Sequence, residues 1–348
     1  MKQIKLTDFT IEGLEESVKR EKISDEEYFK NYSQFISISK LHRIAPERNG
    51  SMDKYYNPPK MKPSEALENG TMIHELTLQP ESFRLAEKCG KPGGLLGLVL
   101  DEIIKNRKSG MKIDEAITKA CNTVGYYTNN EKTRRNAILK KGHELLACYL
   151  KIKDYDDTYV VPSDKNYEIV ESCVNNFNKN YLIQKQMHPT DDFCEPCPAF
   201  AEDCLHKHYK VSYGDKSCVL KMRGKLDHWA INPEKKCLML NDVKTTSDAP
   251  NKEWMADGAH FQAFNYQMQF AGYFDMLESL AKKEYGYDPS TWSRKANVWA
   301  IHTRWNYSAW SFRVDEELLE KGRKSFERAL KMVAYYEIFG HDEEVEFI

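Results

Sequence analysis

Two short apolar segments separated by a turn restrict the fold of this chain more than any other feature. Residues 219–231 and 238–246 carry apolar side chains at frequent intervals, and the sequence Asn-Pro-Glu-Lys-Lys between them is typical of a turn. We therefore expect a β-hairpin, with Asp227 on its first strand and Asp242 and Lys244 on its second. Side chains two residues apart share one face of a strand, so Asp242 and Lys244 should point into one space, where Asp227 can join them.

Two carboxylates and one ammonium group on the same face of a sheet suit the hydrolysis of a phosphodiester. The carboxylates can bind a hard divalent cation such as Mg²⁺ or Mn²⁺, which polarises a phosphoryl oxygen and lowers the pKa of a bound water. Lys244 can orient or deprotonate that water, or stabilise negative charge in the transition state. The alternative is a surface hairpin with solvated charges, because Asp-x-Lys is common by chance.

A glycine before the first aspartate and two threonines after the lysine extend this pattern. Gly224-Lys225-Leu226-Asp227 followed by Asp242-Val243-Lys244-Thr245-Thr246 resembles the motif pair of the PD-(D/E)XK nuclease superfamily. Within it, the chain is most similar to the phage and prophage exonucleases of the exonuclease VIII (RecE) type, over about residues 34 to 280. The resemblance implies an α/β, restriction-endonuclease-like fold, in which helices flank a mixed central sheet and the N-terminal portion is helical.

A histidine on a helix predicted to begin near Ser64 and to end at Pro80 is a further candidate metal ligand. Gly70-Thr71-Met72-Ile73-His74, with the Leu-x-Leu-x-Pro-Glu-x-Phe that follows, resembles the segment of these exonucleases whose histidine completes the metal shell. Without the resemblance, a histidine at such a position is more often a satisfied core residue. The resemblance implies that Mg²⁺ or Mn²⁺ is held by His74, Asp227, Asp242 and the backbone carbonyl of Val243.

The segment 260–283 is predicted to form a helix on which one polar aromatic face stands out. Tyr266, Gln269 and Tyr273 fall on that face, together with Gln262. Their order resembles the closing motif of the family, which implies that Gln269 and Tyr273 support catalysis. Tyr266 is a candidate for DNA binding, because such side chains hydrogen-bond phosphates or stack on bases. An ordinary half-buried Tyr/Gln face is the alternative.

The net charge of −2 does not by itself indicate nucleic acid binding, but the charge is unevenly distributed. Residues 219–247 contain six basic and three acidic residues, and two of these acids are the proposed metal ligands. We therefore predict that Arg223 and Lys225 hold a DNA backbone. Glu202, in a predicted strand over 199–211, is a reserve carboxylate in case His74 is not a ligand.

The resemblance also implies an activity and partners. It implies a 5′-to-3′ exonuclease that acts on double-stranded DNA ends and leaves 3′ single-stranded overhangs for phage-type recombination. A single-strand annealing protein would be its partner, and the enzyme would be a ring-shaped homo-oligomer. Two alternatives stay open: another nuclease of the superfamily, acting as an endonuclease or on single strands, and an inactive DNA-binding or interaction protein that keeps the fold.

The chain contains no run of about 18 apolar residues and no signal peptide at its start, so we expect a cytoplasmic protein without a membrane span. Nine cysteines, an odd number, favour reduced thiols. No iron–sulfur cluster is expected, because related nucleases place three cluster cysteines behind the core and no cysteine follows Cys237. A local zinc site is a further possibility, with the ligands Cys194, Cys197, Cys204 and His206.

The domain organisation predicted from these patterns is simple. Residues 1–33 are expected to form an N-terminal arm or exposed helix, and residues 34–348 the nuclease domain, with a helical insertion at about 84–155. Within the insertion, helices are predicted near 95–108, 112–122 and 131–151, and further helices at 164–187 and 315–339. Two further strands, 297–303 and 309–314, are expected to extend the sheet at its edge.

Overall fold

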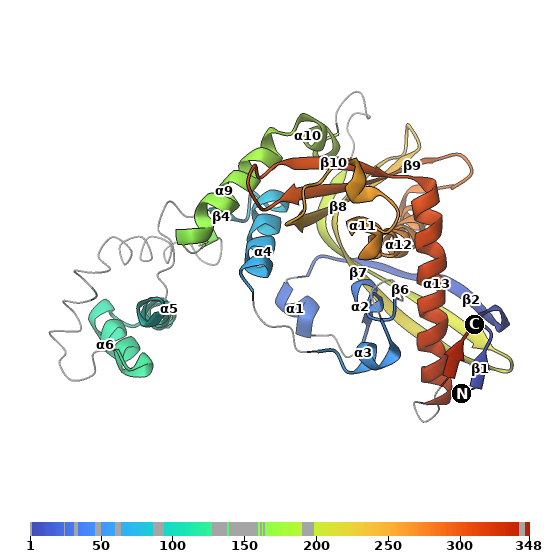
Figure 1. The fold of residues 1–348 in the computed structure, drawn as a ribbon, viewed down its shortest axis with the longest axis horizontal. Helices are drawn as coiled ribbons and strands as arrows, with labels where there is room; N and C mark the ends of the chain where they lie inside the picture. Colours follow the sequence, from blue (N-terminus) through green and yellow to red (C-terminus); the bar gives the residue numbers. More distant parts are fainter. Residues whose placement is uncertain are drawn as a thin grey trace. The chain divides into compact units, whose positions relative to one another are not determined.

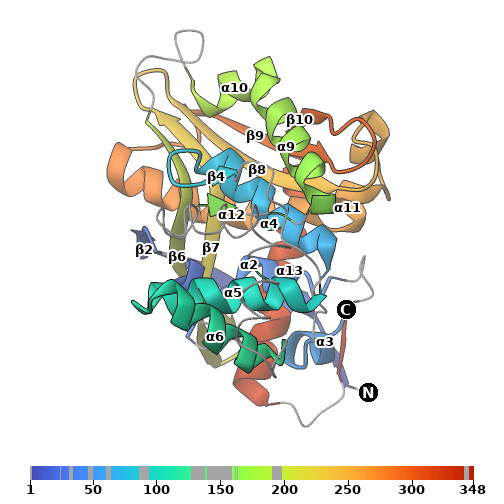
Figure 2. The same ribbon diagram turned by 90° about the vertical axis from the view of Figure 1, so that its left-hand side faces the viewer.

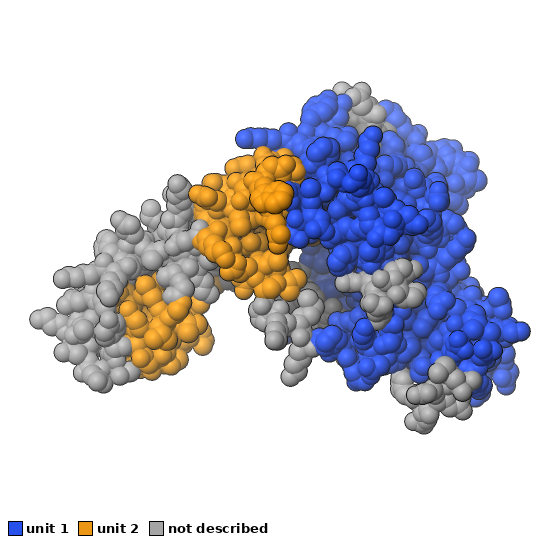
Figure 3. All heavy atoms as spheres, in the orientation of Figure 1, with its two compact units in different colours: residues 1–62, 179–302, 309–348 blue, residues 63–178, 303–308 orange. Residues whose placement is uncertain are grey.

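The computed structural model describes residues 2–23, 25–30, 34–45, 50–59, 64–85, 94–126, 138, 159–160, 162, 164–189, 198–340 and 345–348. The chain divides into two compact units, which are coloured separately in Figure 3. Unit 1 comprises residues 1–62, 179–302 and 309–348, and unit 2 comprises residues 63–178 and 303–308. None of the described helices is long and apolar enough to cross a membrane.

Unit 1 is built on a seven-stranded mixed sheet, which confirms the predicted fold class of a central sheet flanked by helices. The pairs β8–β9 and β3–β7 are parallel, and the other pairs are antiparallel. Figures 1 and 2 show β2, β6 and β7 side by side. The strands in spatial order are β10 (Ala309–Val314), β9 (Ser293–His302), β8 (Cys237–Thr246), β7 (Lys216–Asn232), β6 (Ala199–Tyr213) and β2 (Phe9–Glu21), with β3 (Ile36–Ser37) paired to β7.

The N-terminal segment corrects the sequence prediction. Residues 9–21 are not a helix but form strand β2, which pairs antiparallel with β6 at the edge of the sheet. Their Lys and Glu content suggested an exposed helix, yet charged side chains are also typical of edge strands, where they oppose aggregation. A short helix, α1 (Asp25–Lys30), follows. Strand β1 (Lys2–Ile4) pairs with β11 (Val345–Phe347), so the two ends of the chain lie together.

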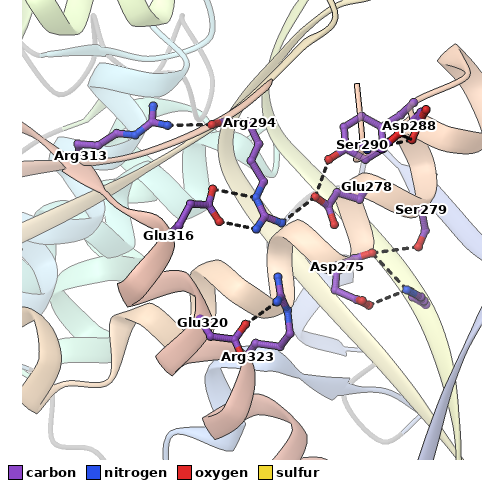
Figure 4. Close-up of polar contacts among 12 residues, drawn as sticks. Asp275, Glu278, Ser279, Asp288, Ser290, Arg294, Arg313, Glu316, Glu320 and Arg323 are labelled. Atoms are coloured by element: carbon purple, nitrogen blue, oxygen red, sulfur yellow. Dashed lines mark hydrogen bonds and ion pairs between the residues drawn. The ribbon is translucent and has the colours of Figure 1, made fainter. Parts of the chain in front are cut away.

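Two long helices of unit 1 cross at very short range. They are α12 (Tyr266–Tyr285) and α13 (Glu316–Phe339). A Cβ atom added to Gly322 of α13 would lie 2.0 Å from the backbone oxygen of Gln267, so only glycine permits this approach. Arg294 of β9 links the two helices, because its guanidinium donates hydrogen bonds to Glu278 of α12 at 3.1 Å and to Glu316 of α13 at 3.0 Å (Figure 4).

The predicted helix over 260–283 is interrupted. Helix α11 (His260–Ala263) ends before Asn265, and α12 begins after it. Asn265 adopts the left-handed conformation with φ 54° and ψ 37°, which asparagine tolerates better than most residues do. The break changes the direction of the chain, so that Gln262 belongs to a different helix from Tyr266 and Gln269. A short 3₁₀ helix, η4 (Lys252–Met255), precedes α11.

The other elements of unit 1 are short. Helix α2 (Ile38–Leu41) follows β3, and α3 (Met52–Tyr56) and the 3₁₀ helix η1 (Leu6–Asp8) lie elsewhere in the N-terminal part. The predicted helix over 164–187 is also two helices, of which the first lies in unit 2 up to residue 178 and the second in unit 1. Asn180 ends α9 (Asp164–Lys179) and caps α10 (Tyr181–Met187) through its side-chain oxygen, which accepts a hydrogen bond from the Ile183 N–H at 3.1 Å.

Unit 2 is mainly helical in its described part, and the predicted insertion falls within it. Its helix α4 (Glu65–Leu78) bears His74 and is capped by Ser64. The helices predicted near 95–108 and 112–122 are observed as α5 (Gly94–Lys108) and α6 (Ile113–Val124), and strands β4 (Arg84–Leu85) and β5 (Tyr159–Val160) form a small parallel pair. The helix predicted over 131–151 lies outside the described residues, apart from Ile138.

The close crossing of α12 and α13 generates a prediction. Gly322→Ala would force the two backbones apart, and overpacking of this kind costs about 1–3 kcal/mol of stability. We expect a lower urea midpoint with an unchanged slope. Lys324→Ala, an exposed substitution on the same helix, should leave the midpoint unchanged. Equal midpoints for Gly322→Ala and the wild type would contradict the tight crossing.

Candidate active site

The alternation of side chains along β6 and β7 shifts by one residue at Glu202 and Asp227. The register pairs Asp203 with Leu226, so these two side chains share a face. The Trp229 indole N–H nevertheless donates to Asp203 Oδ2 at 2.9 Å, although a regular strand would place Leu226 and Trp229 on opposite faces. Glu202 has a φ of 57°, a left-handed conformation that interrupts the strand. Irregularities of this kind re-aim side chains and are common near active sites.

This shift directs two carboxylates toward one another. Glu202 and Asp227 occupy opposite positions in the register of β6 and β7, between the pairs Ala201–His228 and Asp203–Leu226. Oxygen atoms of the two carboxylates lie within 4.8 Å of each other. Glu202, held in reserve by the sequence analysis, is therefore part of the acidic cluster. Glu202 also forms an ion pair with Lys225.

Asp227 and Asp242 meet where the hairpin opens. Backbone pairing between β7 and β8 runs from Asn232–Cys237 to His228–Asn241, one position before the two aspartates. Beyond it, the Asp227 carboxylate accepts a hydrogen bond from the Val243 N–H at 2.7 Å. Burial raises the pKa of Asp227, against the opposing effects of Lys244 and of this hydrogen bond.

Asp242 is almost completely buried and is held from two sides. Its carboxylate is 1% exposed and forms an ion pair with the Lys244 ammonium. The other oxygen accepts a hydrogen bond from Gln269 Nε2 at 3.0 Å, and the same amide nitrogen donates to the Tyr273 hydroxyl at 3.1 Å. Gln269 thus uses both of its amide protons to link Asp242 to Tyr273.

Lys244 completes this cluster on the face predicted from the sequence. Its Nζ atom lies 3.4 Å from the Val243 carbonyl oxygen and 5.1 Å from the centroid of the Tyr266 ring. Burial by itself would lower the pKa of Lys244, but the charges of Asp242 and Asp227 outweigh it, and the pKa is raised. The structure therefore brings Asp227, Asp242, Lys244, Gln269, Tyr273 and Tyr266 together in unit 1.

Gly224 makes room for this arrangement. A Cβ atom at this position would lie 2.6 Å from Cε1 of Tyr273, so a larger residue would displace the tyrosine ring. The glycine before Leu226 and Asp227 therefore has a packing role, which is to let Tyr273 reach Gln269.

The two basic residues predicted to hold DNA are placed differently. Arg223 is 1% exposed, and its guanidinium lies 4.0 Å from the centroid of the Tyr28 ring. The shift in side-chain alternation before Asp227 explains the error, because residues 223 and 227 no longer share a face. Lys225 is paired with Glu202. Arg223 is therefore a buried structural cation, and the prediction that it holds DNA is wrong. Lys225 forms an ion pair with Glu202, and its contact with DNA stays a prediction.

A row of buried polar side chains, which the sequence pattern did not predict, crosses three strands next to the acids. Asn297 Nδ2 donates to Asn241 Oδ1 at 2.8 Å, and Asn241 Nδ2 lies 2.9 Å from His228 Nδ1. His228 Nε2 lies 3.1 Å from the Met187 carbonyl oxygen, and burial lowers the pKa of His228 to about 4. The imidazole is therefore neutral, donating from Nε2 and accepting at Nδ1. Without the register, these three residues have no common signal in the sequence.

His74 and the proposed zinc ligands are the remaining candidates. His74 is on α4 of unit 2. Of the proposed zinc ligands, Cys194 and Cys197 lie outside the described residues. Cys204 is buried, its Sγ atom lies 3.2 Å from His206 Nε2, and burial raises the pKa of the thiol to about 12, so it stays protonated.

The buried polar row generates a second prediction. Asn241→Leu would leave the inward-facing groups of His228 and Asn297 without their hydrogen bonds, at a cost of about 2–4 kcal/mol. Denaturant unfolding should show this loss. Lys210→Leu, at an exposed position of β6, is the matched control and should change stability by less than about 0.5 kcal/mol. A stability loss no larger than that of the control would show that the row contributes nothing.

Comparison with known proteins gives a remote likeness at the level of structure. No protein-family model matches the chain, and no curated protein matches it. A solved structure from Eubacterium rectale, described as a "putative exonuclease", is similar with a TM-score of 0.45 and 11% sequence identity. The alignment covers 90% of this chain and 85% of that one. The functional assignment therefore rests on the residues of the site.

Proposed function

We propose that this protein is a metal-dependent deoxyribonuclease of the PD-(D/E)XK type. The observation that carries the proposal is the convergence of Asp227, Asp242 and Lys244 at the open end of the hairpin, with Glu202 beside Asp227. Carboxylates with an adjacent ammonium group suit phosphodiester hydrolysis, and the sequence around them resembles the motif pair of the PD-(D/E)XK nucleases.

The donor set fits a hard divalent cation. Two carboxylates within 4.8 Å of each other repel, and burial opposes the ionised form of Asp227, so a cation between them would relieve both effects. Oxygen ligands suit Mg²⁺ or Mn²⁺. Bound there, the ion would supply Lewis-acid catalysis and an acidified water. Asp227, Asp242, Glu202 and the Val243 carbonyl would hold it, and His74 stays a proposed ligand on its sequence pattern alone.

The protein side chains would divide the other tasks. Lys244, held by Asp242 and next to the Tyr266 ring, presents an ammonium group that can orient the attacking water or stabilise charge on the phosphoryl oxygens. Gln269 fixes the orientation of the Asp242 carboxylate and is itself tied to Tyr273. Hydrogen bonds of this kind keep a metal ligand in its productive orientation.

The finer assignment follows from the family resemblance. We propose cleavage of double-stranded DNA ends in the 5′-to-3′ direction, with 3′ overhangs passed to a strand-annealing protein in phage-type recombination. A ring-shaped homo-oligomer is part of the same proposal. An endonuclease or single-strand nuclease of the superfamily is the main competitor. Comparing linear duplexes labelled at one 5′ or one 3′ end with closed circles and single strands would separate these activities.

The central prediction concerns the acids and the lysine. With Mg²⁺, the wild type should degrade linear duplex DNA, and Asp242→Asn and Lys244→Ala should each reduce the rate at least about 100-fold. EDTA should abolish the activity, and added Mg²⁺ or Mn²⁺ should restore it. Lys235→Ala, in the turn of the same hairpin, is the control and should cleave at the wild-type rate. Equal DNA loss in the wild type and both variants would refute the nuclease assignment.

Gln269 provides a finer test of how Asp242 is held. Gln269→Leu removes both hydrogen bonds of the amide, and loss of such support typically costs about 10–100-fold in activity or metal affinity. Tyr273→Phe leaves the bond between Gln269 and Asp242 in place, so its effect should be smaller. The rate of duplex degradation against Mg²⁺ concentration measures both. A larger defect in Tyr273→Phe than in Gln269→Leu would contradict this role.

A further inference from the structure

Stacked rings run without interruption from the outermost strand of the sheet to the catalytic lysine. Neighbouring ring centroids lie 4.5–6.2 Å apart, with interplanar angles of 7° to 27°. At the inner end, Lys244 Nζ lies 5.1 Å from the centroid of the last ring. The ring row consists, in order, of Trp310, Phe312, Trp254, His260, Phe264 and Tyr266.

The strand register places the outer rings on the face that carries the acids. Trp310 pairs with Ala300, which pairs with Lys244. Phe312 pairs in the same way with Val298, which pairs with Asp242. Directly paired residues share a face, and neighbouring strands are about 4.8 Å apart, so the backbone of Trp310 lies about 10 Å across the sheet from that of Lys244. A single bound nucleic acid strand is long enough to reach both residues.

Exposure varies along the ring row. Trp310 is 48% exposed, although it lies parallel to Phe312, and Phe264 and Tyr266 near the lysine are half-buried. Trp254, in the middle, is only 3% exposed. The buried Trp254 indole therefore holds the outer rings, Trp310 and Phe312, in a fixed position relative to the inner rings, Phe264 and Tyr266. An exposed indole at the end of a ring row that reaches a cluster of acids and a lysine suits a binding surface better than core packing.

We propose that the ring row is a stacking surface for unpaired bases of the DNA strand whose phosphodiester lies at Lys244. This inference rests on the proposed function and names a part of its substrate. Every base has a π face, so stacking tolerates any sequence, as an enzyme that degrades DNA progressively requires. The outer rings would hold bases beyond the scissile phosphate, while the inner rings and the ammonium group hold the nucleotide being cleaved.

The test measures binding without cleavage. In EDTA, fluorescence anisotropy of a labelled oligothymidylate should show binding by the full-length protein, and Trp310→Ala should weaken it about 10-fold or more. Trp310→Phe keeps a ring and should stay within about 3-fold of the wild type. Tyr181→Ala, which removes another ring that is 72% exposed, is the matched control and should bind normally. Circular dichroism would verify that each variant is folded.

The outcomes separate this inference from the proposed function. The stacking surface is refuted if the wild type does not bind the oligonucleotide, or if Trp310→Ala binds it as tightly as the wild type. Such a result, obtained together with Mg²⁺-dependent cleavage by the wild type, leaves the nuclease assignment intact. Conversely, binding that depends on Trp310 in a protein without Mg²⁺-dependent cleavage supports the stacking surface and overturns the nuclease.

Discussion

The buried carboxylate of Asp242 is the constraint on which the rest of the site depends. An ionised group that is 1% exposed is costly unless it is paired and hydrogen-bonded, and here Lys244 and Gln269 meet both requirements. Lys244 comes from the same strand, two residues away, and needs only the strand geometry. Gln269 comes from a helix, so its contribution requires that helix to lie at one position over the sheet.

Two close approaches set the position of that helix. Gly322 lets α13 cross α12 beside Gln267, and Gly224 leaves the space that the Tyr273 ring occupies. The turn at Asn265 sets where α12 begins. A side chain added at either glycine would move the helix that bears Gln269, and the Asp242 carboxylate would lose a partner. Backbone packing and the electrostatics of the site are thus coupled.

The two faces of the sheet near the site perform different tasks. Asp242 and Lys244 face the helix that bears Gln269 and Tyr273, whereas Asn241, one residue earlier, joins the buried row with His228 and Asn297. The neutral row links three neighbouring strands through side chains and supports the charged cluster from behind. On the charged face, the ring row extends from Lys244 to the edge strand, so that the proposed catalysis and the proposed DNA contact share one surface.

The sequence alone determined the hairpin, the common face of Asp242 and Lys244 and the last long helix of the chain, because period-two and period-3.6 patterns depend only on neighbouring residues. It did not determine that Arg223 is buried. The left-handed conformation at Glu202 shifts the alternation of side chains between the two faces, and no residue type in the sequence indicates that conformation. Strand β2 was missed because a charged edge strand resembles an exposed helix. The approach of Glu202 to Asp227 and the ring row join distant segments, so only the tertiary structure decided them.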